Sequence, residues 1–223
     1  PMTLTRRRLL SALAAAGGAG ALSSRETRAR LSDREAFESL LATGMVDLAV
    51  HYEIVSGPGA GDQTTRQGTI DGPQIHIPIG TLGTATPSGS MLVTFELPDG
   101  GPVPNNPASL WLATECPTPG GTLLADAIQL TISTADCATG SPIQRIAQGT
   151  LREVGEVMQT GRQVDGDPTT GAMDCLTDSA CVLIEYELAD YVGNETVDLP
   201  LWFGATQCRH DPQANPFADR EVQ

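Results

Sequence analysis

Alternation of apolar and polar residues is the strongest pattern in this chain. In MVDLAVHYEIV, residues 45–55, the apolar residues are Val46, Leu48, Val50, Tyr52 and Ile54, and Asp47, His51 and Glu53 alternate with them. This period of two is typical of a half-buried β-strand. Six further segments share it: QIHIPIG (74–80), MLVTFEL (91–97), SLWLAT (109–114), AIQLTIS (127–133), CVLIEYEL (181–188) and TVDLPLWF (196–203). Seven or eight short strands separated by turn-rich gaps predict an all-β fold, an antiparallel two-sheet sandwich of jelly-roll type.

One internal segment has a helical pattern instead. In TLREVGEVMQTG, residues 150–161, Thr150 and Glu153 form a capping box and Gly161 supplies a stop. Its apolar stripe consists of Leu151, Val154 and Met158. The pattern predicts a short helix that lies over a sheet edge or barrel mouth. The segments at 97–107 and 165–171, LPDGGPVPNNP and DGDPTTG, have the composition of loops.

The first 29 residues have the pattern of an export signal. TRRRLL, residues 5–10, leads into the apolar, glycine-containing run LLSALAAAGGAGAL at 9–22, which is too short for a permanent membrane span. Arg6 and Arg7 fit the twin-arginine route, and Ala29 is the expected cleavage point. A basic, disordered N-terminus is the alternative. No later run approaches 18 apolar residues, so we expect no stable membrane span in the mature chain.

This pattern divides the chain into four parts. We expect the export signal at 1–29, an N-terminal segment at 30–44, one β-sandwich domain at 45–210 and a C-terminal tail at 211–223. The domain length suits a single core. Secretion or display at the cell surface follows from the signal.

Acidic residues dominate the charge of the expected mature chain. The whole chain has 13 basic residues, all arginine, and 27 acidic ones. Five of the arginines and one glutamate lie in the signal, so residues 30–223 carry a net charge of −18. Such a surface repels nucleic acids and anionic membranes. Because salt screens self-repulsion, we interpret this charge as adaptation to concentrated salt, with cation binding as the alternative.

All five cysteines follow the signal, and disulfides persist outside the cell. Cys175 and Cys181 flank a short loop and are the first expected pair. Cys116 with Cys137 is the second, which leaves Cys208 free, paired between chains, or part of another pattern. A zinc site is disfavoured because no CxxC spacing occurs and only His210 lies near Cys208.

No catalytic pattern emerges from the residues. The histidines, His51, His76 and His210, include no HExxH helix, and His51 and His76 fall on the polar side of their strands. GxSxG and phosphate-loop motifs are absent from the sequence. Asp165, Asp167 and Asp174 are not accompanied by the Gly and Glu that an EF-hand needs at fixed offsets. We interpret them as an acidic loop. We therefore expect no enzyme activity, no metal site and no cofactor. Asn194 begins an N-x-T tripeptide between two predicted strands and is a candidate for glycosylation.

The segment before the first strand is apolar as well. Ser32 and Glu35 form a capping box, and Phe37, Leu40 and Leu41 share a stripe, which together predict a short helix. An extended arm is the alternative. The stripe could also pack on the chain's own sheet.

Both ends of the expected mature chain resemble the TasA/camelysin family, whose members are processed by a SipW-type signal peptidase. Members typically show a small residue, an aromatic or apolar one, SD-x-E-x-F, L-x-x-G and an LDL strand. The matching positions here are Ala29, Leu31, Ser32, Asp33, Glu35, Phe37, Leu41, Gly44, Val46, Asp47 and Leu48. Near the other end, Gln207, Cys208, Arg209 and His210 are similar to the EQCRHN of haloarchaeal members. GTLREV and LADAIQLTI resemble internal segments. Leu31 stands where an aromatic residue is usual.

The resemblance implies a jelly-roll-like domain that is exported as a subunit of a biofilm-matrix or pilus-type filament. Relatives assemble by donor-strand complementation, in which the N-terminus of one subunit adds a strand to its neighbour's sheet. We therefore expect residues 30–43 to act as an assembly arm, with Arg30, Leu31, Phe37, Leu40 and Leu41 as its contact residues. Identical subunits and the signal peptidase are the expected partners. The alternatives are a monomeric surface binding module and a camelysin-like metalloprotease, for which the sequence has no zinc-ligand pair.

Overall fold

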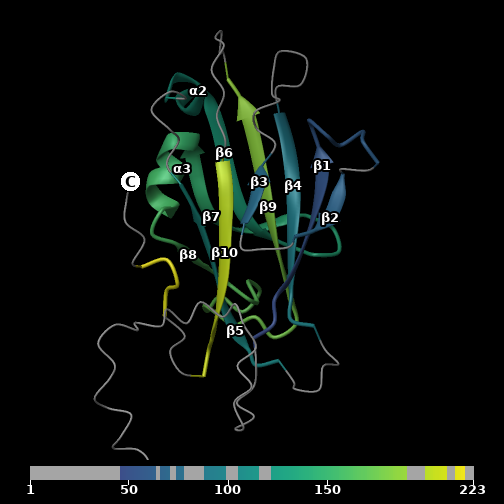
Figure 1. Cartoon of the computed structure of the whole chain (residues 1–223), viewed down its shortest axis with the longest axis vertical. Helices are drawn as coiled ribbons and strands as arrows, with labels where there is room; N and C mark the ends of the chain where they lie inside the picture. The colour runs from purple at the N-terminus through teal and green to yellow at the C-terminus, as the bar shows by residue number, and fades with distance from the viewer. Residues whose placement is uncertain are drawn as a thin grey trace, which may run out of the picture. The chain divides into compact units, whose positions relative to one another are not determined.

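Two antiparallel β-sheets stacked face to face form the domain in a computed structural model of the chain (Figure 1). The structure describes residues 46–63, 66–70, 74–77, 88–98, 105–115, 122–189, 199–209 and 214–218. All of them belong to one unit, Glu38–Gln223.

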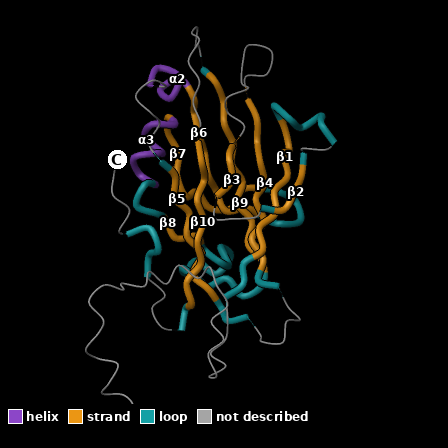
Figure 2. The backbone as a smooth tube through the Cα atoms, viewed as in Figure 1, coloured by secondary structure: helices purple, strands orange, loops and turns teal. Residues whose placement is uncertain are grey.

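The larger sheet contains six strands and the smaller sheet four. In spatial order, the larger one is β2 (Gln67–Thr69), β1 (Ala49–Ser56), β4 (Ser88–Glu96), β9 (Ser179–Leu188), β6 (Ile128–Ala135) and β7 (Pro142–Thr150). The smaller one is β3 (Gln74–Ile77), β10 (Leu199–Gln207), β5 (Ala108–Thr114) and β8 (Arg162–Val164). Two helices, α2 (Thr122–Ala127) and α3 (Leu151–Met158), complete the described elements and lie together beside β6 and β7 (Figure 2).

Successive strands cross between the sheets along most of the chain. β3, β4, β5 and β6 alternate between the two sheets, and β8, β9 and β10 do so again. Every ladder within the two sheets is antiparallel. This interleaving gives the jelly-roll character, and it confirms the predicted all-β sandwich.

The core fills the space between the two sheets. The inner faces of β4, β9 and β6 meet those of β5 and β10, and their buried apolar residues form one cluster. Phe95 of β4 contacts Phe203 of β10 edge-to-face, with ring centroids 5.6 Å apart. Aromatic pairs in this geometry add about 1 kcal/mol beyond the area they bury. The strand parity is also confirmed, since Val50 and Ile54 of β1 are buried whereas Val55 is exposed.

The helix expected after residue 150 is present. Thr150 Oγ1 accepts a hydrogen bond from the Glu153 backbone (3.2 Å), and Glu153 Oε2 accepts one from the Thr150 backbone (2.8 Å). The stripe of Leu151, Val154 and Met158 is buried, so the helix covers one end of the core. Arg152 of α3 forms an ion pair with Asp126 of α2, with 2.6 Å between Arg152 Nε and Asp126 Oδ1.

Four described elements escaped the sequence pattern: β2, β7, β8 and α2. β2 and β8 have three residues each, too few to show a period. β7 is an edge strand whose first four residues are all exposed, so its sequence carries no apolar alternation. α2 has only six residues and no acidic residue in its first turn.

Tyr186 of β9 is fully buried beside Gly89 of β4, its partner across the ladder. The Tyr186 hydroxyl has no hydrogen-bond partner within the described residues. Burial raises the pKa of Tyr186 to about 12. A buried, unsatisfied hydroxyl costs about 1–3 kcal/mol.

We expect Tyr186→Phe to leave stability at pH 7 unchanged or raise it by about 1 kcal/mol, because it removes the unpaired hydroxyl. The raised pKa also predicts a pH dependence. Above the unfolded pKa of about 10 the unfolded chain releases the tyrosine proton and the folded chain keeps it, so wild-type stability falls by up to about 1.4 kcal/mol per pH unit.

Chemical denaturation between pH 8 and pH 11 checks this expectation. The difference in unfolding free energy between Tyr186→Phe and wild type should widen above pH 10. Tyr52→Phe is the matched control, because Tyr52 also lies against a cross-strand glycine, Gly68. Profiles that stay parallel up to pH 11 would contradict the assignment.

Candidate functional site: the open edge of the four-stranded sheet

Most edges of the two sheets are short or polar. β2 and β8 have three residues each, and β7 begins at Pro142 and carries Arg145. Proline, charge and shortness all oppose strand addition. These edges therefore offer little to an incoming strand.

The edge of β10 differs from them. β3 pairs with residues 199–202 of β10, whereas residues 203–206 have no strand partner on that side within the described residues. We call residues 203–206 the open edge. Phe203, which packs on Phe95, and Ala205, which is half-buried, face the core here. An added strand would therefore lie over apolar interior.

The start of the described chain adjoins the same end of the sandwich. The Asp47 backbone donates to Asn105 Oδ1 (2.7 Å), and the Cys208 backbone donates to the Pro107 carbonyl (3.0 Å). The beginning of the domain and the end of β10 thus flank one short segment, and Figure 1 shows both at the lower end. Val46 and Leu48 are only partly buried against the core. The chain enters the domain where the open edge lies.

A C-terminal segment packs on the outer face of β10. Residues 214–218 lie against Gly204, where an added Cβ would come within 3.1 Å of Pro216. Thr206 Oγ1 donates to the Ala214 carbonyl (3.2 Å), and Asn215 Nδ2 donates to the Thr160 carbonyl (2.7 Å). Phe217 is buried in a small cluster on this face, whose other members are Trp111, Ala113 and Trp202. Residues 214–218 of the predicted tail are therefore packed on the domain, which the sequence pattern was not used to predict. The apolar residues Pro216 and Phe217 were the signal for this packing.

The disulfides differ from the expected pairs. Cys137 pairs with Cys181 (Cα–Cα 5.3 Å) and Cys175 with Cys208 (Cα–Cα 6.4 Å), so the predicted Cys175–Cys181 and Cys116–Cys137 pairs are wrong. Leu176 bridges Ala108 of the smaller sheet, whereas Cys181 lies in β9 of the larger one. Residues 176–181 therefore cross between sheets and carry the two cysteines apart. Cys208 is paired rather than left over.

One disulfide lies beside the site and the other lies on the larger sheet. Cys175–Cys208 ties the 165–175 loop to the end of β10, next to the open edge. Cys137–Cys181 fastens the tip of the β6–β7 hairpin over the outer face of β9, where it covers Leu183 and Ala135.

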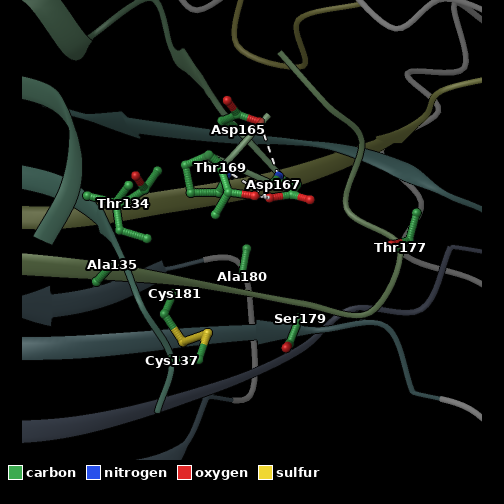
Figure 3. A pocket seen from close by; sticks show the side chains of 13 residues that line it. Thr134, Ala135, Cys137, Asp165, Asp167, Thr169, Thr177, Ser179, Ala180 and Cys181 are labelled. Carbon is green, nitrogen blue, oxygen red and sulfur yellow. Dashed lines mark hydrogen bonds between the residues drawn. A yellow bond between two sulfur atoms is a disulfide. The ribbon is translucent and has the colours of Figure 1, made fainter. Parts of the chain in front are cut away.

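A pocket of about 290 Å³ lies between this hairpin tip and the 165–170 loop (Figure 3). Its carboxylates are held by the loop itself. Asp165 Oδ1 accepts from the backbones of Asp167 (3.1 Å) and Asp174 (3.0 Å). Hydrogen bonds from the side chain and backbone of Thr169 lower the pKa of Asp167. The described ranges contain no group of three metal-binding side chains, and these carboxylates serve as turn acceptors.

Several predicted site residues lie outside the described part of the chain. They are Arg6, Arg7, Ala29, Arg30, Leu31, Phe37, Leu40, Leu41, Cys116 and Asn194. His51 is placed on the outer face of β1, where Nδ1 lies 3.1 Å from Thr69 Oγ1. Among the described helices, none has the length and apolar character that a bilayer crossing requires.

Comparisons with protein-family models, curated proteins and solved structures give no match. The resemblance to TasA/camelysin proteins therefore rests on the sequence motifs.

Proposed function

We propose that this protein is an exported structural subunit of an extracellular filament, assembled when the N-terminal arm of one subunit adds a strand to the next. The observation that carries the proposal is the open edge, which lies over apolar core at the end where the chain enters the domain. Main-chain hydrogen bonds would supply affinity, and alternate side-chain pockets would supply register.

Two further observations support it. Both disulfides suit an oxidising compartment outside the cell. The two family-like terminal motifs, at residues 46–48 and 207–209, flank the same short segment beside the open edge.

Electron microscopy of the exported product, purified in molar salt, tests the proposal. We expect filaments from the full chain and dispersed particles from a chain lacking residues 30–43. Because that deletion adjoins the expected cleavage point, Phe37→Ser with Leu41→Ser provides a second variant of unchanged length. Ser32→Ala with Ser39→Ala is the matched control and should still form filaments.

Two outcomes would overturn the proposal. Filaments from the deletion variant would show that the arm is dispensable. Folded monomers from the full chain would favour the monomeric binding module.

A further inference from the structure

We infer that a groove on the outer face of β1, β2 and β4 binds a neutral saccharide. These strands are neighbours in the larger sheet (Figure 1). The inference concerns a single chain, so it does not depend on the proposed filament.

The groove has a volume of about 450 Å³. The register of the three strands arranges six of its side chains in two rows of three, with one residue from each strand in a row. The rows, in the order β2, β1 and β4, are Thr69, His51 and Thr94, and Gln67, Glu53 and Leu92.

The dimensions of this grid suit a small sugar. Neighbouring strands lie about 4.8 Å apart and alternate residues of one strand about 7 Å apart, so the two rows span about 10 by 7 Å. The groove volume also falls within the range of about 300–1,000 Å³ that is typical of small-molecule sites. We therefore expect a mono- or disaccharide unit to fill it.

The side chains offer what a sugar ring needs. Each hydroxyl of a sugar both donates and accepts hydrogen bonds, and the groove combines hydroxyl, amide, imidazole and carboxylate groups that do both. Leu92 provides apolar surface for the C–H face of a ring. It is half-buried, because it packs against the apolar cluster below the hairpin tip.

The charges in the groove favour a neutral ligand. The Glu53 carboxylate accepts a hydrogen bond from Arg66 Nη2 at 2.7 Å, so an opposite charge compensates it. This pairing leaves no isolated carboxylate here for a cation. Anions are disfavoured by the chain as a whole, since its net charge is −14.

The groove is held in shape before any ligand arrives. His51 Nδ1 lies 3.1 Å from Thr69 Oγ1, which orients the imidazole ring. Cys137 at the hairpin tip also lines the groove, and its disulfide with Cys181 fixes the tip in place. Thr94 Oγ1 lies 3.3 Å from Cys181 Sγ. Such preorganisation lowers the entropy that binding must remove.

Saturation-transfer NMR on the exported product in molar salt tests the inference, because it detects bound sugars on monomers and filaments alike. The neutral probes are maltotriose, cellotriose and triacetylchitotriose, and trigalacturonic acid is the acidic one. Gln67→Ala and Thr94→Val each remove one polar group from the groove. Gln148→Ala is the matched control, because Gln148 is also an exposed glutamine on an edge strand of this sheet. The unfolding transition of each variant verifies that it is folded.

We expect at least one neutral trisaccharide to bind. Gln67→Ala and Thr94→Val should each weaken its affinity about fivefold, the loss that corresponds to one hydrogen bond, whereas Gln148→Ala should leave it unchanged. Absence of saturation transfer to all three neutral probes at millimolar concentration would overturn the inference. Unchanged affinity in both groove variants would overturn the location, and equal binding of trigalacturonic acid would overturn the selection of a neutral ligand.

Discussion

Replacing Cys137 and Cys181 together by alanine is expected to lower the free energy of unfolding by about 4 kcal/mol at 25 °C. The two cysteines are 44 residues apart, and opening a loop of this length releases about that much chain entropy in the unfolded state. The loss has a structural counterpart, because the disulfide holds the hairpin tip over Leu183 and Ala135. For a domain of this size, 4 kcal/mol corresponds to a melting temperature lower by about 8–16 °C.

Guanidinium denaturation in molar salt measures this change. Cys116→Ala, which keeps both observed disulfides, is the control and should change stability by less than about 1 kcal/mol. If the double variant lost as little as that control, the Cys137–Cys181 pairing would be wrong.

Gly89→Ala is expected to destabilise the domain by about 3 kcal/mol. An added Cβ would lie 2.6 Å from the Tyr186 hydroxyl oxygen and 2.7 Å from two of its ring carbons. Tyr186 is buried between packed neighbours, so neither group can move away, and overpacking of this kind is costly. Gly61→Ala is the control, because no atom lies within 4 Å of the added Cβ and the change should stay within about 0.5 kcal/mol.

A double-mutant cycle identifies the cause. In a Tyr186→Ala background, Gly89→Ala should cost less than about 1 kcal/mol, since the ring that it meets is gone. An undiminished cost in that background would show that backbone conformation, rather than the tyrosine, requires glycine at this position.

The strands that line the core were predictable because a strand buried on one face has apolar residues at every second position. β4, β5, β6 and β9 lie in the middle of their sheets, and each was found within a few residues of its observed bounds. β7 could not be found in this way, because its exposed residues face water and need not be apolar. The capping box at Thr150 and Glu153 was local, involving residues three apart, and was predicted fully.

The candidate site depends on relations that sequence proximity does not encode. Cys175 and Cys181 are near in the chain, yet the strand crossing between them puts them on different sheets. Within the described residues, β3 pairs with only four residues of the nine-residue strand β10, a matter of relative strand length and register. Similarly, Pro216 and Phe217 indicate that the tail packs, but only the fold shows that they lie over Gly204.

The position of β10 has a consequence for how the molecule is made. It is the last of the described strands in the sequence, but it lies inside the smaller sheet, between β3 and β5. Among the described strands, a chain released only as far as β9 has β5 paired with β8, whereas β3 has no neighbour in that sheet. Closure of the sandwich must therefore wait until β10 has been made, because the contacts of β10 with β3 span more than a hundred residues. A chain terminated before β10 would leave β3 unattached to the rest of the smaller sheet.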